Sequence, residues 1–562
     1  MTTWLEPTLV LALAFLLGRP LGAYLGKVLE GKPPRVLPLQ WLERAVYCVG
    51  GVDPFVEMTG RGYAMALLRF HLVGLLCVFL VQELQQWLPL NPQRFGAVRW
   101  DVALNTAVSF VTNTDWQAYA GEQTMSHFTQ MLALTVQNFL SAAAGLAVLA
   151  VLARGFTRRE CPTLGNFWAD LVRATVYVLL PLSLIWSVLL VSQGVPQTFS
   201  GHLQVTTLEG TRQTIAIGPV ASQEAIKQVG SNGGGFFNAN SAHPFENPTP
   251  LSNFLETLAI LLLPVACPFA FGHLLGDRKQ GWALFCAMAG LFLVGLLVVL
   301  GAEWSTVPQF ERLGIVGGNV EGKEARFGLI PSALWAQATT AVSNGAVNSA
   351  HESLMPLASL VLMFNMGVGE PIFGGAGAGV LTMMFYVLLT MFLAGLMIGR
   401  TPEYFGKKLG PYEMAMTIVG VVVPVVALLA LASLAIGTPQ GRMGVTGEGA
   451  HGISQVLYAF ASTTGNNGSA LAGLRADLSF YTLATSFAML AGRFATLLPA
   501  IAIASSLARK RAMAATAATF PTSNVFFIAL LMSVVVLEGA LTLFPAFVLG
   551  PVLEHLQLVS GR

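Results

Sequence analysis

Long apolar segments separated by polar loops dominate the pattern along this chain. A helix that crosses a membrane needs about 20 mainly apolar residues. The pattern therefore predicts an all-α integral membrane protein with about ten transmembrane helices. The segments that meet the length requirement lie near 4–25, 62–84, 129–153, 172–192, 251–275, 282–302, 353–398, 413–436, 481–504 and 524–548.

The segment 353–398 is long enough for two crossings, but glycine-rich stretches at 367–371 and 374–379 interrupt it. Broken helices at membrane depth are tolerated only inside protein or beside a watery cavity. We therefore expect one net crossing with a broken middle, and that middle contains Glu370.

The composition agrees with lipid as the main solvent. Hydrophobic residues make up 54% of the 562 residues and charged residues only 10%, whereas soluble proteins are about 25% charged. We therefore treat 1–562 as a single polytopic membrane domain. The five cysteines show no paired or metal-type spacing, so we expect neither a disulfide framework nor a zinc site.

Basic residues concentrate in alternate loops, and the positive-inside rule then predicts that both termini face outward. No basic residue precedes the first apolar segment, which favours an uncleaved first span over a signal peptide. The predicted inner loops hold Lys27, Lys32, Arg35, Arg44, Arg61, Arg154, Arg158, Arg159, Arg278, Lys279, Arg400, Lys407, Lys408, Arg509, Lys510 and Arg511.

Four predicted outer segments contain the same signal, an apolar stretch of half-span length followed at once by a small polar turn. Three turns share a core of Ser or Asn, then Asn, then Gly, beginning at 231, 343 and 466. Thr112-Asn113-Thr114 is a degenerate fourth, 119 residues before the second. The apolar stretches are Asp101–Val111, Ser222–Val229, Ser332–Val342 and His451–Ser462.

A single Asn-Gly pair usually marks an ordinary turn. Here each turn follows a half-length apolar stretch and lies between two spans, which favours a repeated membrane–pore–membrane unit around a central filter. The expected pore repeats are 62–153, 172–275, 282–398 and 413–504, with extra spans at 4–25 and 524–548.

Such turns are typical of a filter that selects a small monovalent cation. A half-helix entering from outside points its carbonyl end, with roughly half a negative charge, at the membrane centre. Gly and Asn allow unusual backbone angles, so successive carbonyls can face one axis, and rings of carbonyls replace the hydration shell of potassium. The candidate ion-binding residues are Thr112, Asn113, Thr114, Ser231, Asn232, Gly233, Ser343, Asn344, Gly345, Asn466, Asn467 and Gly468.

Four further residues are candidates near this filter. Asp115 and Gln117 follow the first turn and are candidates for the mouth of the filter. Gln117 could instead support the filter mouth without lining it. Arg493 lies inside the ninth span, where an ionisable residue is costly and suggests a functional site; the alternative is a structural arginine paired to a carbonyl. Glu370 either lines the cavity below the filter, holds the loop that blocks the inner exit, or is a buried cap on a half-helix.

Three stretches resemble the potassium-binding A subunits of the Kdp ATPases of bacteria and archaea: Thr112–Gln117, Gly233–Pro248 and Thr464–Ser469. The similarity extends over essentially the whole chain, including Glu370 and Arg493. In that family Asn is common where Asp115 stands, and Cys where Asn344 stands.

The resemblance implies a superfamily of potassium transporters with four membrane-pore-membrane repeats in one chain. It also implies a chain that takes potassium from outside through its filter and passes it to the B subunit, a P-type ATPase. A C subunit and a small single-span F subunit would complete the Kdp complex in the bacterial inner membrane. Potassium would be the transported ion, without an organic cofactor, and an arginine of the fourth repeat would sit below the filter.

The same resemblance places ATP hydrolysis on the partner chain. The sequence agrees, because it contains neither a Gly-x4-Gly-Lys-Ser/Thr loop nor an Asp-Lys-Thr-Gly phosphorylation site. Nothing in the charge distribution indicates nucleic acid as a partner.

Two other functions are compatible with the pattern. One is a passive potassium channel or symporter of the Trk/Ktr type, and the other is a membrane receptor or scaffold without transport. The Gly233–Pro248 motif and the ten spans favour the pump subunit over the passive transporters, which usually have eight spans. The repeated pore signal argues against a scaffold.

Overall fold

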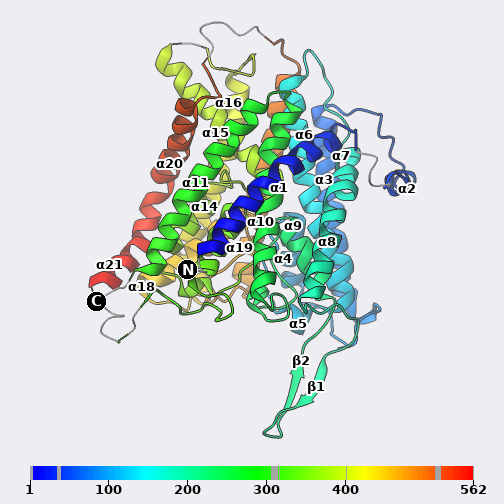
Figure 1. Cartoon of the computed structure of the whole chain (residues 1–562), viewed down its shortest axis with the longest axis vertical. Helices are drawn as coiled ribbons and strands as arrows, with labels where there is room; N and C mark the ends of the chain where they lie inside the picture. Colours follow the sequence, from blue (N-terminus) through cyan, green and yellow to red (C-terminus); the bar gives the residue numbers. More distant parts are fainter. Residues whose placement is uncertain are drawn as a thin grey trace.

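The computed structural model describes residues 4–33, 39–305, 314, 317–399, 401–512 and 520–560. Arg35 and Arg400, both assigned to predicted inner loops, lie outside these residues. Helices dominate the described part (Figure 1), and ten of its helical segments are long and apolar enough to cross a membrane. The predicted number of spans is confirmed. The segments are Leu5–Leu29, Gly60–Trp87, Thr129–Thr157, Phe167–Ser192, Pro250–Leu274, Arg278–Trp304, Ala378–Met397, Pro411–Gly437, Ser479–Ala508 and Val525–Ser560.

Most spans are continuous α-helices, and three contain π-helical segments, at Thr129–Leu134, Ala174–Leu179 and Val548–Val552. A π-helical turn widens a helix locally. The helices of the spans are α1 (Leu5–Leu29), α3 (Gly60–Leu84), α6 (Thr135–Thr157), α7 (Phe167–Arg173), α8 (Leu180–Ser192), α10 (Pro250–Leu274), α11 (Arg278–Trp304), α16 (Pro411–Gly437), α19 (Ser479–Ala508), α20 (Val525–Phe547) and α21 (Leu553–Ser560).

The predicted half-length stretches form short helices, each between two spans in chain order. All four are largely buried inside the bundle, and each ends on one of the polar turns. The predicted membrane–pore–membrane architecture is confirmed. These half-helices are α4 (Trp100–Val111), α9 (Val220–Val229), α13 (Leu329–Ala341) and α18 (Gly449–Thr464).

The seventh crossing is broken, as the sequence predicts. It consists of α14 (Pro356–Gly367) and α15 (Ala378–Ile398), with residues 368–377 between them. Within this break the backbone takes positive φ at both Glu370 (+70°) and Phe373 (+63°). Such backbone is tolerated at membrane depth only because protein surrounds it.

A few elements lie outside the bundle. The strands β1 (Leu203–Thr206) and β2 (Arg212–Ile215) form an antiparallel hairpin that projects beyond the helices (Figure 1). Strands β3 (Glu403–Tyr404) and β4 (Lys407–Lys408) form a second, shorter pair. The remaining short helices are α2 (Gln40–Gly50), α5 (Gly121–Thr124) and α17 (Pro439–Arg442).

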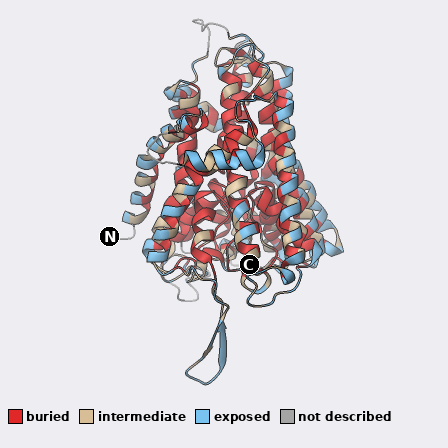
Figure 2. Ribbon diagram, turned by 90° about the vertical axis from the view of Figure 1, so that its right-hand side faces the viewer, coloured by how far each residue is buried: buried red, intermediate tan, exposed pale blue. Residues whose placement is uncertain are grey.

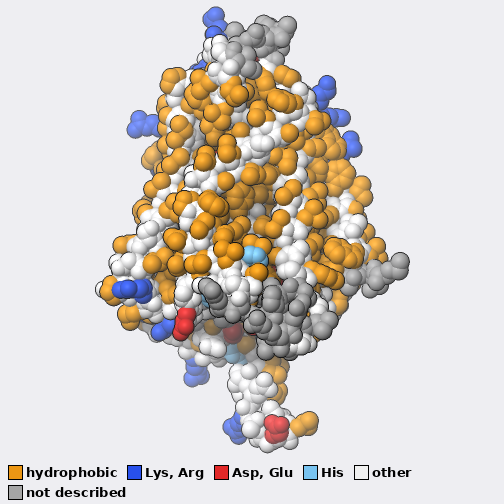
Figure 3. All heavy atoms as spheres, turned by 90° about the vertical axis from the view of Figure 1, so that its left-hand side faces the viewer, with side chains coloured by type: hydrophobic (Ala, Val, Ile, Leu, Met, Phe, Trp, Pro, Cys, Tyr) orange, Lys and Arg blue, Asp and Glu red, His pale blue; other side chains and the backbone are white. Residues whose placement is uncertain are grey.

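Polar and apolar residues are distributed as expected for a protein in lipid. Exposed ribbon follows the outward faces of the long helices, and buried ribbon fills the centre (Figure 2). Hydrophobic side chains cover the face drawn in Figure 3, and charged ones gather toward its two ends. Large apolar residues such as Leu297 and Leu541 are exposed, whereas many Asn, Gln, Ser and Thr residues are buried. The polar interior is where the turns lie.

Glycines set the distance between α1 and α10. Gly18, Gly22 and Gly26, four residues apart, all face α10. A Cβ added at Gly22 would lie 2.5 Å from the carbonyl oxygen of Ala266 and 2.7 Å from the Cβ of Phe269. In lipid, small residues let helix backbones approach, and close packing drives association.

Replacing Gly22 with Leu should therefore separate α1 from α10 and lower stability by about 1–3 kcal/mol, the usual cost of overpacking. The measurement is the thermal unfolding midpoint of the detergent-solubilised protein. The matched control is Gly301→Leu in α11, where an added Cβ has no neighbour within 4 Å. Equal midpoints for the two variants would contradict the packing role of this face.

Candidate functional site

The turns that end the half-helices share one hydrogen-bond pattern. In each turn, a backbone N–H donates a hydrogen bond to the carbonyl oxygen of the residue five positions earlier, which belongs to the half-helix. The N···O distances are 2.8–3.0 Å. The four donors are Thr114, Asn232, Asn344 and Asn467.

The residue before each donor has left-handed backbone. Its φ is +63° at Asn113, +53° at Ser231, +50° at Ser343 and +49° at Asn466. None of these residues is glycine, so the conformation is unfavourable alone and must be held by its surroundings. The shared geometry makes the turns structurally equivalent.

This equivalence shifts the first turn by one residue relative to the sequence comparison. The left-handed residue and the donor that follows it align Asn113 with Ser231, so the first spacing is 118 residues, not 119. Thr112 is then the C-cap of α4. Asp115 stands where the other turns have Gly233, Gly345 and Gly468.

The turns converge on one small region. A Cβ added at Gly233 would lie 2.7 Å from the carbonyl oxygen of Thr114, 2.9 Å from that of Asn467 and 3.0 Å from that of Asn344. One glycine of the second turn thus meets backbone oxygens from each of the other turns. Gly468 likewise lies against the carbonyl oxygen of Thr114.

Side-chain amides connect the turns into a closed ring. Each of four asparagines donates from Nδ2 to an oxygen of a neighbouring repeat, so the first repeat contacts the second, the second the third, the third the fourth, and the fourth the first. The bonds run from Asn113 to Ser231 O (2.7 Å), from Asn344 to Lys227 O (3.3 Å), from Asn467 to Thr339 O (2.7 Å) and from Asn466 to Thr114 Oγ1 (2.9 Å).

A buried lysine braces the second turn. Lys227 of α9 is fully buried, and its Nζ lies 2.6 Å from Glu224 Oε2 and 2.9 Å from Glu246 Oε2. It also donates to Asn240 Oδ1 at 3.0 Å and to Ser241 Oγ at 3.1 Å. The ammonium therefore ties the half-helix to the chain that follows the turn.

Glu246 also contacts the backbone that directly follows the second turn. Its Oε1 accepts a hydrogen bond from the backbone N–H of Phe237 at 2.8 Å, and a Cβ at Gly235 would lie 2.7 Å from the same oxygen. Glu256, a further buried carboxylate, accepts from Gln228 of α9 at 3.2 Å. Removing the ammonium would leave buried carboxylates without a counter-charge, which is strongly unfavourable.

The break of the seventh crossing lies against the carboxyl end of α13 and against the first turn. The N–H of Gly374 donates to the last carbonyl of α13 at 3.0 Å. A Cβ at Gly375 would lie 3.9 Å from the carbonyl oxygen of Val342 and 4.0 Å from Asn113 Nδ2. The buried Glu370 accepts from the N–H of Gly375 at 3.1 Å. Glu370 thus fixes the break in this position.

Arg493 lies in the same region. Its side chain is buried in α19, and Nη2 donates to the carbonyl oxygen of Ser141 at 2.6 Å. One helical turn earlier, the carbonyl of Met489 accepts from the side chain of Asn466 at 3.0 Å. The Arg493 side chain therefore lies against a carbonyl oxygen of α6, one helical turn from the residue that bonds to Asn466.

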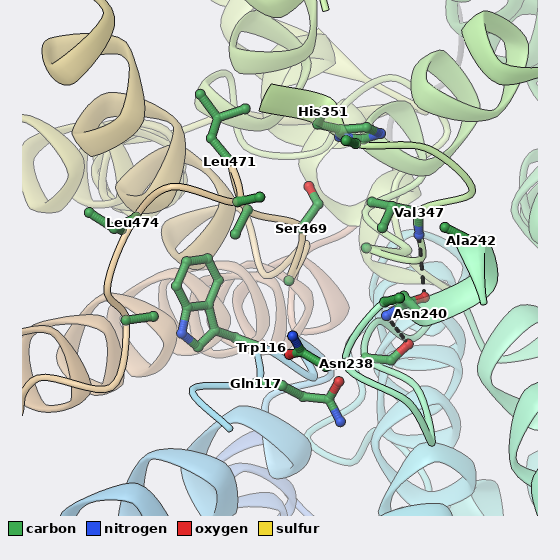
Figure 4. A pocket seen from close by; sticks show the side chains of 18 of the residues that line it. Trp116, Gln117, Asn238, Asn240, Ala242, Val347, His351, Ser469, Leu471 and Leu474 are labelled. Atoms are coloured by element: carbon green, nitrogen blue, oxygen red, sulfur yellow. Dashed lines mark hydrogen bonds between the residues drawn. The ribbon is translucent and has the colours of Figure 1, made fainter. Parts of the chain in front are cut away.

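On the other side of the turns lies a cavity of about 790 Å³, which Asp115, Gly234, Gly345 and Gly468 help to line. Its labelled side chains come from segments 116–117, 238–242, 347–351 and 469–474 (Figure 4).

Gln117 both lines this cavity and pairs with the backbone of Gly235, donating to its carbonyl at 2.8 Å and accepting from its N–H at 3.0 Å. Both roles considered for Gln117 from sequence are therefore compatible with its position. The carboxylate oxygens of Asp115 are buried and have no hydrogen-bond partner within the described residues.

The sequence matches the family model described as potassium-transporting ATPase A subunit over residues 8–556. The chain belongs to this family. The potassium-transporting ATPase potassium-binding subunit of Methylibium petroleiphilum is 52% identical over 572 residues, which cover 100% of this chain and 99% of the relative. The corresponding subunit of Yersinia enterocolitica is 53% identical over 544 residues, 96% of each chain.

Among solved structures, the chain is similar to the potassium transporter TrkH from Vibrio parahaemolyticus. The sequence identity is 15%, the TM-score is 0.48, and the similarity covers 75% of this chain and 83% of that one. The family membership inferred from the motifs is confirmed by the relatives and the family model.

The sequence interpretation missed the Lys227 network and Ser141. A signal was present, because Glu224 and Lys227 are spaced by three on a half-helix that has to be buried. Such a spacing places two opposite charges on one helix face. The partner Glu246 lies beyond the turn, and only the folded chain brings it back.

Replacing Lys227 with Met should lower the apparent affinity for potassium about ten-fold or more, because breaking a buried ion pair costs about 3–5 kcal/mol and part of that loss distorts the second turn. The measurement is the potassium dependence of transport in vesicles with matched protein amounts.

The control is Lys407→Met. Lys407 is equally buried, but it donates to backbone carbonyls of Gly155 and Leu507 away from the turns. If both variants lose affinity equally, Lys227 has only a general structural role; unchanged affinity in Lys227→Met would also refute the brace.

Proposed function

We propose that this chain is the potassium-binding and translocating subunit of an ATP-driven potassium uptake pump. The observation that carries the proposal is the convergence of backbone carbonyls from three of the four equivalent turns on Gly233 of the remaining turn. Rings of such carbonyls replace the hydration shell of potassium. The family match supports the same function.

The electrostatics of the site support a cation that has lost its water. Each half-helix directs its carboxyl end at the turns, and helix carboxyl ends carry roughly half a negative charge. Asp115 is the one ionisable residue in the turns themselves. Selection therefore rests mainly on dipoles, with one additional carboxylate near the mouth.

We assign the turns as the selectivity filter, with Asp115 and Gln117 at its mouth and Arg493 and Glu370 beneath it. The first turn contributes through Asn113, Thr114 and Asp115, with Thr112 as its anchor on α4. The other filter residues are Ser231, Asn232, Gly233, Ser343, Asn344, Gly345, Asn466, Asn467 and Gly468. We propose that the four pore repeats span 62–153, 172–275, 282–398 and 413–504.

The names of the relatives support partner chains. These relatives are named as potassium-binding subunits of an ATPase, which supports ATP hydrolysis on another chain. We propose that the B subunit, a P-type ATPase, receives the ion, and that the C and F subunits complete the complex. We also propose a bacterial inner-membrane location with both termini outside, since the basic residues of the loops favour this orientation.

A passive channel of the Trk/Ktr type is the alternative. Two observations favour the pump subunit over it. The family model covers residues 8–556, and the break that carries Glu370 packs against the end of α13 and against the first turn. We propose that this break obstructs a straight exit from the filter.

Replacing Gly233 with Asp should weaken potassium uptake and relax discrimination against rubidium and ammonium. The added side chain would collide with carbonyl oxygens of the other turns at 2.7–3.0 Å and would add a fixed charge where dipoles select the ion. The measurement is competitive uptake of the three cations in a strain that lacks other potassium transporters.

The matched control is Gly96→Asp, an outer-loop glycine whose Cβ would have no neighbour within 4 Å. Wild-type affinity and discrimination in a correctly assembled Gly233→Asp variant would refute the filter assignment.

Replacing Arg493 with Met should raise ion occupancy below the filter and weaken the coupling of uptake to ATP hydrolysis. A fixed positive charge opposes a cation 4 Å away by about 1–4 kcal/mol, depending on the effective dielectric. Large passive currents should not appear, because the break still obstructs the exit.

The measurements are potassium-stimulated ATPase activity and electrical recording on the purified complex. Arg493→Lys keeps the charge and should retain most of the coupling. If Arg493→Met shows wild-type stimulation and transport, Arg493 is purely structural.

A further inference from the structure

An arginine without a counter-charge lies on the outer surface of the third helix. Arg69 is exposed on α3, nine residues after the helix begins at Gly60. Within the described residues it forms no salt bridge and no hydrogen bond. A lone charge on a membrane-spanning helix is costly unless something outside the chain compensates it.

Arg69 stands at one end of an apolar groove of about 490 Å³ between α3 and the span that contains α6. The π-helical segment Thr129–Leu134 forms part of its wall, and Gly74 leaves its floor without a side chain. The other lining residues include Phe70, Val73, Cys77, Val81, Val136 and Trp168.

A second unused donor lies at the same end. Trp168, near the start of α7, packs its ring 6.3 Å from that of Phe70, the neighbour of Arg69. No hydrogen bond is formed by its indole N–H within the described part of the chain. Guanidinium and indole groups at the edge of an apolar surface are typical of the membrane–water interface.

The groove has the length of one lipid tail. From Arg69 to Val81 the helix rises by about 18 Å, whereas one leaflet of the hydrocarbon core is about 15 Å thick. Side chains of a helix lean toward its N-terminus, so Arg69 extends toward the Gly60 end. The charge thus lies at the end of the groove nearer Gly60, and the apolar walls continue from it toward Val81.

We propose that this groove binds an anionic phospholipid, whose phosphate contacts Arg69 and the Trp168 indole and whose acyl chain lies along Val73, Cys77 and Val81. A lipid satisfies both halves of the site, because it supplies a negative group and a flexible apolar chain in one molecule. A zwitterionic lipid would fit the groove but would leave Arg69 less well compensated. This site is independent of the filter and of the proposed transport function.

The test uses the complex as purified from membranes, with all subunits that co-purify. Native mass spectrometry compares the binding of dioleoyl-phosphatidylglycerol and dioleoyl-phosphatidylcholine to wild type, Arg69→Gln and Arg61→Gln. Arg61 is a matched control, since it is also exposed on α3 but does not line the groove.

Wild type and Arg61→Gln should retain phosphatidylglycerol preferentially, and Arg69→Gln should lose affinity for it about ten-fold, as expected for removal of a charge-assisted hydrogen bond. Equal binding of phosphatidylglycerol by all three proteins would overturn the proposal. A Val73→Trp variant, which fills the groove but keeps Arg69, should also lose the lipid.

A photo-crosslinker at Val136 identifies the occupant in intact membranes. An adduct with the mass of a lipid supports the site. An adduct with a polypeptide would show that another chain of the complex covers the groove and would overturn the proposal. Wild-type elution of each variant complex in size-exclusion chromatography controls for folding.

Discussion

The absence of water at membrane depth is the constraint on which this structure depends. A backbone that leaves helical geometry there must find hydrogen-bond partners within the protein. In the four turns, the N–H groups return to their own half-helices and the asparagine side chains bond to neighbouring repeats. The carbonyl oxygens that remain face one another around Gly233. A cation is the partner that such a group of oxygens can accept.

The same constraint explains why costly charges lie so close to the turns. Lys227 with its carboxylates and Arg493 with Ser141 are buried, and buried charges seldom improve stability over apolar packing. These buried charges instead orient the backbone near the turns, because each holds in place a backbone segment that apolar contacts could not orient. The π-helical segments and the broken crossing are further departures from regular helix inside the bundle.

Much of the architecture could be predicted from the sequence, because apolar length and half-length are local properties. The spans, the half-helices and the break at Glu370 are of this kind. The register of the first turn was missed because Asp115 replaces the glycine that marks the other turns. Contacts such as Lys227 with Glu246, or Gly22 with Ala266, depend on how distant segments pack. No local pattern could specify them.

The left-handed residues of the turns have a consequence for biogenesis. Asn113, Ser231, Ser343 and Asn466 each hold a conformation that costs about 1–3 kcal/mol for a non-glycine residue, and hydrogen bonds between repeats restrain the turns of Asn113, Ser231 and Asn466. The bond from Asn466 to Thr114 joins the last repeat to the first. During synthesis, therefore, the ring of turns cannot close until the fourth repeat has been inserted. A chain released earlier would keep its helices but would leave the ring open.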